Sequence, residues 1–214
     1  DREPDKADAP PIPDTVTEQP KDAQLAAIEQ PPVNPVTPTA PQSTNTAPSH
    51  PEPPPVVITS TNKVYGGLED VRIGVAGQHY APESAAIAAH GIGEDRPLDF
   101  HSPYGCSKGT ADQYVHDYAR SYGLHTVVFR MSCIYGQRQF GTEDQGWVAH
   151  FLLRAIDGKP ITVYGDGRQV RDILYVDDLV DAFLLAERDI ERLSGQAFNI
   201  GGGPGNVISL LDLL

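Results

Sequence analysis

The sequence predicts an α/β fold built on a parallel sheet, and three observations support this prediction. The segment Val56 to Gly66 begins with a short apolar, β-branched run, continues with a cluster of small polar residues and ends in a glycine. This order is typical of a buried parallel strand followed by a site-forming loop. A second apolar run, Leu124 to Met131, has the same character. The stretch between them, 99–122, carries the signals of a helix. Strands that alternate with helices in this way indicate an α/β protein.

Residues 1–55 have a composition that argues against a packed core. They hold 15 of the 20 prolines, nine acidic residues, three basic residues and no aromatic residue. Such a segment buries too little apolar surface to offset its loss of conformational entropy. We therefore predict that 1–55 is disordered and partly polyproline-like, and that 56–214 is the folded domain. The one helix-prone patch, 22–29, is too short to be stable alone.

Charge and composition exclude several classes of function. Residues 56–214 contain 20 acidic and 13 basic residues, a net charge of −7, which argues against general nucleic-acid binding. No apolar run approaches ~18 residues, so we expect no membrane span. The start lacks the features of a secretory signal, and Cys106 and Cys133 read as reduced thiols, so we expect a cytoplasmic protein. The seven histidines form no HExxH motif or paired cluster, and we expect no metal.

The helix predicted from Ser102 onward carries a candidate acid/base pair. Ser102 is a plausible N-cap and Pro103 suits the first turn. Tyr104 and Lys108 lie four residues apart, which places both side chains on one helical face. A phenol is a poor base at neutral pH, but a neighbouring ammonium stabilises its ionised form. Tyr104 is therefore a candidate general acid/base tuned by Lys108, and a solvated helix face is the alternative.

The remaining elements follow along the chain. Residues 68–98 lack clear periodicity and are expected to form a surface insertion with one short helix near 83–89. After the strand ending at Met131, we expect a ligand-facing loop at 132–139, because ligands collect at the carboxyl ends of parallel strands. Further predictions are a helix over 145–157, a turn at 165–167 between two strands, a helix over 178–187 capped by Asp177, a strand at 197–200, a glycine loop at 201–203 and the first turns of a helix at 209–214.

Three segments, VVITSTNKVYG, DFHSPYGCSKG and the later GRQVRD, resemble the NAD-dependent epimerase/dehydratase family, the extended branch of the short-chain dehydrogenase/reductases. The resemblance covers 56–214. It implies a partial Rossmann-type doubly wound parallel sheet with part of a small substrate-binding α/β region. It also implies NAD as cofactor and a triad of Thr61, Tyr104 and Lys108, since the family places a Ser or Thr four residues before the tyrosine of its VYG motif.

The resemblance implies further site residues. Residues on the cofactor side would be Ser60, Tyr104, Lys108, Met131, Ser132, Cys133 and Ile134. Those on the side of the nucleotide-sugar substrate would be Asn62, Lys63, Arg138, Gln145, Arg171 and Asn199. An exposed loop arginine is the alternative for Arg138, and pairing with Asp172 or Asp177 is the alternative for Arg171. A homodimer through the Tyr104/Lys108 helix is also implied.

One expected motif is absent. The family binds NAD through an N-terminal βαβ unit with a Gly-rich turn, and neither Gly91-Ile92-Gly93 nor 201–205 matches that fingerprint. The sequence therefore reads as an internal piece of a family member, with the first half of the nucleotide domain replaced by the proline-rich stretch and with a truncated end. Whether such a chain is an active enzyme stays open.

Within the family, the residues after Thr61 favour epimerisation. Nucleotide-sugar dehydratases carry an Asp–Glu pair there, whereas this chain has Asn62 and Lys63, which cannot act as paired carboxylates. The resemblance is greatest to the branch that acts on CDP-linked sugars, and other nucleotide-sugar epimerases or reductases remain alternatives. A non-catalytic interaction protein or a pseudogene product is the alternative from a different class.

Overall fold

The structure is a computed structural model that describes residues 53–214. The predictions for 1–52, including the helix-prone patch at 22–29, lie outside this range. None of the helices in 53–214 combines the length and the apolar run that crossing a membrane requires.

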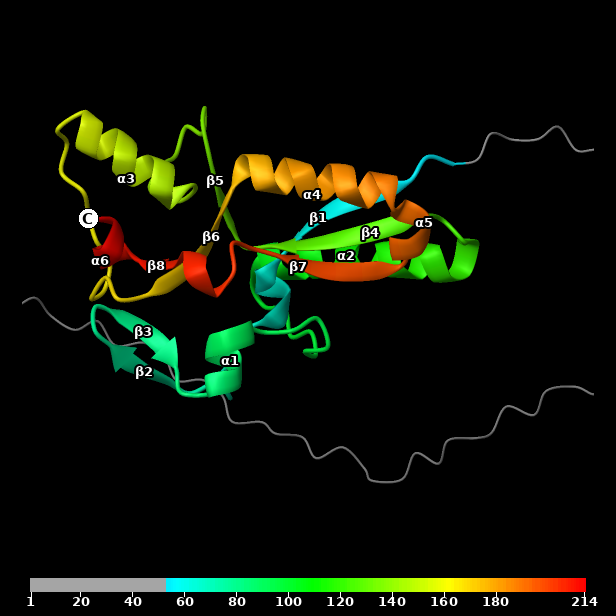
Figure 1. The fold of residues 1–214 in the computed structure, drawn as a ribbon, viewed down its shortest axis with the longest axis horizontal. Helices are drawn as coiled ribbons and strands as arrows, with labels where there is room; N and C mark the ends of the chain where they lie inside the picture. The colour runs from blue at the N-terminus through cyan, green and yellow to red at the C-terminus, as the bar shows by residue number, and fades with distance from the viewer. Residues whose placement is uncertain (1–52) are drawn as a thin grey trace, which may run out of the picture. The chain divides into compact units, whose positions relative to one another are not determined.

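The main sheet contains three parallel strands in the order β1-β4-β7. They are β1 (Val56–Thr61), β4 (Thr126–Met131) and β7 (Gln196–Ile200). Thr61 pairs with Met131, and Met131 pairs with Ile200, so the carboxyl ends of the three strands lie together. Helix α2 (Ser102–Tyr122) lies on one face of this sheet and α4 (Val176–Arg188) on the other (Figure 1). This arrangement confirms the predicted α/β class and the parallel, doubly wound sheet.

The hydrophobic core lies on the α4 side of the central strand. Successive side chains of a strand point to opposite faces, so Val127 and Phe129 face α4 while Val128 and Arg130 face α2. The Phe129 ring packs against the Phe183 ring of α4 at a centroid distance of 5.1 Å. The other buried members of this cluster are Leu174, Leu179 and Ala186. The burial of β4 on both faces explains its near-continuous apolar sequence.

Helix α2 begins and ends where the sequence predicts. The Ser102 hydroxyl accepts a hydrogen bond from the Gly105 N–H at 3.1 Å, so it caps the first turn although Ser102 itself is assigned to the helix. Gly123, with φ of 67°, closes the helix in the left-handed conformation. A Cβ on Gly109 would overlap the Phe100 ring, and a Cβ on Gly105 would lie 3.5 Å from the Lys63 carbonyl oxygen. Gly109 therefore leaves room for the Phe100 ring against α2, whereas the space at Gly105 would accept a methyl group.

A second, mixed sheet is built from β5 (Cys133–Tyr135), β6 (Val170–Tyr175) and β8 (Val207–Ser209). Strand β6 pairs parallel with β5 and antiparallel with β8. The predicted helices near 145–157 and 209–214 are α3 (Trp147–Ile156) and α6 (Leu210–Leu213). Two short helices, α5 (Ile190–Leu193) and η2 (Pro204–Asn206), were not predicted.

Three local predictions for this region were wrong. The segment 132–139 is not entirely a loop, because β5 lies within it. The turn at 165–167 has a strand only on its carboxyl side, since 161–164 pairs with no strand in the described chain. Asp177 does not cap α4: the N-cap is Tyr175, without a side-chain hydrogen bond, and Asp177 lies inside the first turn. There its negative charge interacts favourably with the positive end of the helix dipole.

The insertion contains more structure than predicted. Its short helix is α1 (Ala85–His90), capped by the Ser84 hydroxyl. The sequence prediction missed the hairpin of β2 (Ile73–Ala76) and β3 (His79–Pro82), which is joined by a tight turn at Gly77 with φ of 64°. A single 3-10 turn, η1 (Asn62–Tyr65), connects β1 to the insertion.

Candidate active site

Lys108 and Thr61 lie at the carboxyl end of β1. The Lys108 Nζ donates a hydrogen bond to the carbonyl oxygen of Thr59 at 3.0 Å, which places the ammonium two residues before Thr61 on the same strand. The Thr61 hydroxyl accepts a hydrogen bond from the Lys63 N–H at 3.3 Å and so caps η1. Thr61 is buried, with 6% of its surface exposed. The Thr61 hydroxyl and the Lys108 ammonium are therefore both held near the carboxyl end of β1.

Tyr104 lies one helical turn before Lys108, in the first turn of α2. Its side chain is 53% exposed, so the phenol is open to a ligand. The next residue, Gly105, lies beside the Lys63 carbonyl of η1, since a Cβ on it would be 3.5 Å from that oxygen. The start of α2 and the end of β1 thus adjoin each other at the edge of the sheet where the strands finish.

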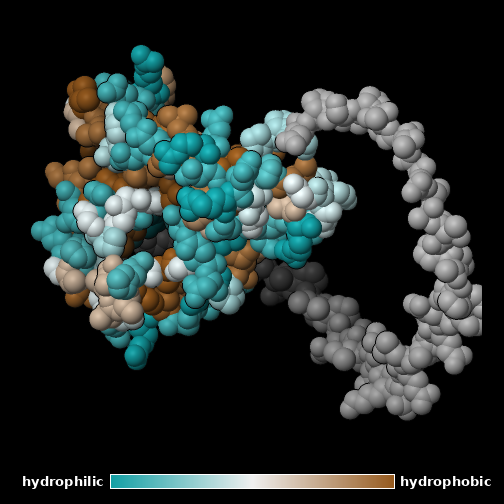
Figure 2. Space-filling model, turned by 45° about the vertical axis from the view of Figure 1, so that its right-hand side comes forward, coloured by the Kyte–Doolittle hydropathy of each residue, from teal (hydrophilic) through white to brown (hydrophobic). Residues whose placement is uncertain are grey.

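A cavity of about 770 Å³ opens beside this strand end. Three of the predicted site residues, Asn62, Ser132 and Asn199, line it, together with residues of the insertion. Its size is in the range of small-molecule sites in proteins. Figure 2 shows a hollow in one face of the described chain, with both hydrophilic and hydrophobic residues at its rim.

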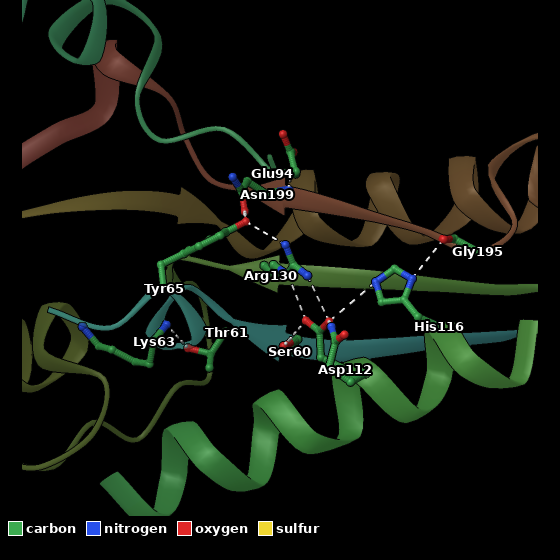
Figure 3. Close-up of polar contacts among 11 residues, drawn as sticks. Ser60, Thr61, Lys63, Tyr65, Glu94, Asp112, His116, Arg130, Gly195 and Asn199 are labelled. Carbon is green, nitrogen blue, oxygen red and sulfur yellow. Dashed lines mark hydrogen bonds and ion pairs between the residues drawn. The ribbon is translucent and has the colours of Figure 1, made fainter. Parts of the chain in front are cut away.

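A buried ion pair links α2 to the central strand. Arg130 of β4 donates to both carboxylate oxygens of Asp112, at 2.9 and 3.0 Å, and the Ser60 hydroxyl donates to the same carboxylate at 3.0 Å (Figure 3). Asp112 is fully buried and Arg130 is 5% exposed. Burial opposes both charges, but their mutual hydrogen bonds outweigh it, so the pKa of Asp112 lies below its ordinary value and the pKa of Arg130 lies above.

The same arginine connects to the cavity. Its Nη1 donates to the Tyr65 hydroxyl at 3.0 Å, and that hydroxyl donates to Asn199 Oδ1 at 2.7 Å (Figure 3). Asn199 Nδ2 donates to the Ile92 carbonyl at 2.8 Å, and the Asn199 N–H donates to the Glu94 carboxylate at 2.7 Å. Both side-chain groups of Asn199 are therefore engaged by the protein. The chain of contacts runs from the Tyr104/Lys108 helix, through β4 and β7, to the insertion.

The half-buried residue Asp172 also belongs to the cavity lining. Asp172 Oδ1 accepts a hydrogen bond from the Gly202 N–H at 2.6 Å, and a Cβ on Gly201 would overlap the same carboxylate. The glycine loop at 201–203 was predicted to let backbone approach a ligand, and the group it approaches is Asp172. Burial raises the pKa of Asp172 despite the backbone hydrogen bonds.

The other predicted site residues are spread over the second sheet and its loops. Arg171 lines a smaller cavity of about 180 Å³ with Trp147 and Tyr164. Its Nη1 donates to the Val170 carbonyl, and the described residues show no ion pair of Arg171 with Asp172 or Asp177. Arg138 and Gln145 are exposed in the segment between β5 and α3, and Lys63 is exposed on η1. Met131 and Ile134 pack against the hydrophobic core, and Cys133 begins β5.

Sequence reasoning missed the polar residues that organise the site. Asp112 falls one turn after Lys108 and Arg130 falls in an apolar strand, and a buried charge in such a strand is a signal that a partner exists. Tyr65 was treated as part of a motif without a role of its own. Asp172 was considered only as a partner for Arg171.

Comparison with known proteins identifies the family. The model of the NAD dependent epimerase/dehydratase family matches residues 49–201, which is more than half of the chain. The chain belongs to the NAD-dependent epimerase/dehydratase family. It is 47% identical over 163 residues to the CDP-paratose 2-epimerase of Salmonella typhi, covering 74% of this chain and 47% of that protein.

Solved structures of family members share the fold. The UDP-glucose 4-epimerase of Thermotoga maritima, solved with UDP-glucose, has a TM-score of 0.57 and 32% identity, covering 73% of this chain and 44% of that chain. The dTDP-glucose 4,6-dehydratase of Bacillus anthracis, in complex with NAD, has a TM-score of 0.56 and 29% identity over 74% of this chain and 43% of that one. The chain thus spans about half the length, or less, of these family members.

Proposed function

We propose that this chain carries the catalytic half of a nucleotide-sugar epimerase that acts through transient NAD-dependent oxidation of a sugar hydroxyl, with a CDP-linked sugar as substrate. One observation carries the proposal. The contact of Lys108 Nζ with the Thr59 carbonyl supports it, because it brings α2 to the end of β1 that carries Thr61. The cavity of about 770 Å³ is lined by the neighbouring residues Asn62 and Tyr65, and not by Thr61, Tyr104 or Lys108 themselves. The similarity to the CDP-paratose 2-epimerase supports the choice of substrate.

The residues at this strand end fit the nicotinamide end of NAD. The Ser132 hydroxyl follows β4, is buried, and has no hydrogen-bond partner among the described residues, so it is free for a polar ligand group. The Lys108 ammonium suits ribose hydroxyls as well as the Tyr104 phenolate. Ser132, Lys108 and Tyr104 would hold this end of the cofactor. The residues before β1 offer no Gly-rich turn to bind the pyrophosphate of NAD, because the first glycine of the chain is Gly66.

The proposed chemistry assigns one role to each residue of the triad. Thr61 and Tyr104 orient the hydroxyl at the sugar carbon to be inverted, and Tyr104 takes its proton, with Lys108 stabilising the phenolate. When bound, NAD would supply the acceptor of the hydride from that carbon and its donor to the opposite face. Tyr104 holds the proton meanwhile and returns it to the oxygen. Atoms and electrons therefore balance over the cycle, and the product is the epimer.

Dehydration is the second candidate, since a dehydratase is among the structural matches. Elimination of water needs a general acid and a general base next to Thr61. Asn62 and Lys63 occupy those positions, and neither is a carboxylic acid. Asn62 lines the cavity, where its amide can bind a hydroxyl without transferring a proton. These residues favour epimerisation.

The test is a paired measurement on the purified chain. NAD is titrated and followed by protein fluorescence, and epimerisation of CDP-paratose with added NAD is followed by NMR. We expect Lys108→Ala to weaken NAD binding about 10-fold or more and Tyr104→Phe to reduce turnover by about 100-fold or more, since general acid/base catalysis contributes factors of this size. Lys159→Ala and Tyr114→Phe are the matched controls, because Lys159 follows α3 and Tyr114 is an exposed residue ten positions after Tyr104 on α2.

Two results would decide against the proposal. Saturable NAD binding that Lys108→Ala leaves unchanged would remove Lys108 from the cofactor site. No saturation at millimolar NAD, with a folded chain, would favour the non-catalytic interaction protein instead.

A further inference from the structure

The main sheet ends at β1, and one edge of this strand is open. Within the part of the chain that the structure describes, β1 pairs only with β4, and it lies at the end of the sheet away from β7 (Figure 1). The Val56 N–H donates to the His125 carbonyl at 2.9 Å, so the backbone groups of Val56 face β4. Backbone groups of successive residues in a strand point to opposite sides, so those of Val57, Thr59 and Thr61 face the open edge. A further strand would pair with these groups.

The Lys108 ammonium occupies the middle of this edge. Its Nζ donates a hydrogen bond to the Thr59 carbonyl at 3.0 Å. Thr59 is the central one of the three outward-facing residues, so a strand that paired along the whole edge would need the same carbonyl. A hydrogen bond from a charged donor is stronger than one from a backbone N–H. Lys108 therefore competes with any strand that approaches β1.

A charged side chain also binds the opposite edge of the sheet, at β7. The Ser132 N–H donates to the Ile200 carbonyl at 2.9 Å, so the backbone groups of Ile200 face β4 and those of Asn199 face away from it. The outward Asn199 N–H donates to the Glu94 carboxylate at 2.7 Å. Charged side chains at edge strands are one of the ways in which proteins prevent edge-to-edge pairing. The contact of Lys108 with β1 fits the same purpose.

The sequence of β1 suits pairing with an identical strand. Its six residues, VVITST, include no charge, no proline and no glycine, and all except Ser60 are β-branched. Short segments of this composition pair readily with copies of themselves. The segment has no charge that a partner of opposite charge could complement. Residues 53–55 are all proline and cannot donate to a ladder, so the pairing segment begins at β1.

A twofold axis through Thr59 would use the whole edge. Two identical strands related by such an axis run antiparallel, and the same patch is used on both copies. Thr59 then lies opposite its own counterpart, and Val57 lies opposite Thr61 of the second copy. In this register every outward-facing residue meets another outward-facing residue. The central pair needs both Thr59 carbonyls, which are the groups that Lys108 binds.

We propose that the open edge of β1 is an interface for a second copy of this chain, and that the Lys108 ammonium keeps it closed. When Lys108 leaves the Thr59 carbonyl, β1 of one copy pairs antiparallel with β1 of the other, and the two sheets become one continuous sheet. This interface differs from the dimer through the Tyr104/Lys108 helix that the sequence resemblance implies. It goes beyond the proposed function, because neither cofactor nor substrate takes part.

The experiment measures the mass of the purified chain by light scattering over a dilution series. We expect Lys108→Met to raise the mass at least twofold over that of the wild type, with self-association stronger by about 10-fold or more, since a charge-assisted hydrogen bond no longer blocks the edge. Arg120→Met is the matched control, because Arg120 is an exposed cation in the last turn of the same helix. Its mass should equal that of the wild type.

Substitutions of Thr59 locate the interface, since this residue is exposed and lies on the proposed axis. Like charges opposite each other in a strand pair repel, and opposite charges attract. Added to Lys108→Met, either Thr59→Lys or Thr59→Glu should return the mass to the wild-type value. An equal mixture of these two double variants should associate again. Circular dichroism confirms that each variant is folded, and Lys108→Ala serves as a second variant that opens the edge.

Three results would overturn this inference. The first is a wild-type mass in folded chains of both Lys108 variants. The second is association that persists in both Thr59 double variants, which would point to another surface, such as the exposed side chains of Tyr114, Tyr118 and Tyr122 on α2. The third is a mixture of the double variants that fails to associate, because it would show that Thr59 does not lie opposite its counterpart.

Discussion

Asp112 shows how a single side chain can fix the position of helix α2. Its carboxylate accepts four hydrogen bonds, two from Arg130, one from Ser60 and one from the Gln113 amide. Buried ion pairs gain little over apolar contacts, but removing one partner leaves an uncompensated charge. Since Asp112 lies one turn after Lys108, the position of the proposed catalytic pair, Tyr104 and Lys108, depends on this carboxylate.

Asp112→Asn should therefore lower the free energy of unfolding by about 3–5 kcal/mol, because the Arg130 charge remains buried without a counter-ion. Urea denaturation followed by circular dichroism measures the change. Asp117→Asn is the control, since Asp117 is on the same helix and exposed, and its effect should stay within about 0.5 kcal/mol. Equal effects of the two substitutions would show that the buried pair contributes nothing to stability.

The pKa of Asp172 is shifted in the direction opposite to that of Asp112. Burial raises its pKa in the folded state, so the folded protein is favoured when Asp172 is protonated, below its unfolded pKa of ~3.9. This contribution is lost as pH rises through the raised folded value. Asp172→Asn keeps an oxygen for the Gly202 N–H and removes the charge.

We expect the Asp172→Asn chain to be more stable than the wild type at pH 7, with the difference vanishing near pH 3. Thermal unfolding across this pH range measures it. A wild-type chain that is the more stable of the two at pH 7 would mean that Asp172 gains more from its contacts than it loses by burial.

Helix α2 contains two glycines whose surroundings differ. Alanine is favoured over glycine in a helix by about 1 kcal/mol, so either substitution gains on propensity alone. A Cβ on Gly105 meets ordinary contacts of 3.5 Å or more, whereas a Cβ on Gly109 would overlap the ring of Phe100.

Gly105→Ala should thus be neutral or stabilising by up to about 1 kcal/mol, and Gly109→Ala should be destabilising by about 1–3 kcal/mol. Denaturant unfolding of the two variants provides the comparison, with each serving as the other's control. A stabilised Gly109→Ala chain would show that the Phe100 ring moves aside freely.

The elements recovered from the sequence are those with a strong local pattern. The two apolar runs that became β1 and β4 and the capped helix α2 were predicted near their observed bounds. The hairpin β2–β3 was missed because its residues are half-buried or exposed and show no alternation. Strand β8 has three residues and pairs with a strand 32 or more positions earlier, which no local signal reveals.

For the candidate site too, the sequence predicted some residues and not others. Thr61, Tyr104 and Lys108 were predicted from spacing and resemblance, and their roles remain a proposal. The partners that position them, Asp112 and Arg130, are 18 residues apart and belong to different elements. Their pairing is a property of the packed sheet and helix, so it could not be inferred from a motif.

The described chain combines a well-buried sheet with a peripheral hairpin, and local stability should follow this difference. Strand β4 has hydrogen-bonded neighbours on both sides and helices over both faces. Strand β2 pairs only with β3 among the described residues, and Ile73 and Val75 are about 60% exposed. Local opening is easier where few buried contacts must be broken.

Hydrogen exchange followed by mass spectrometry should show the slowest exchange in peptides from β4 and faster exchange, by about 100-fold or more, in peptides from β2. Bound CDP-paratose should slow exchange in β3 and α1, which line the cavity, more than in β2. Uniform exchange across 53–214 would contradict this order.

The engagement of Asn199 has a consequence for anyone who redesigns this scaffold. Its amide spans the space between Tyr65 and the carbonyl of Ile92, and its backbone N–H is bound by Glu94. A loop transplanted from another enzyme in place of 66–100 must therefore supply two acceptors, one in place of the Ile92 carbonyl and one in place of the Glu94 carboxylate. Without them the Asn199 amide would keep unpaired N–H groups next to Tyr65 and Arg130. The graft would then disturb helix α2, which is linked to Asn199 through these two residues and Asp112.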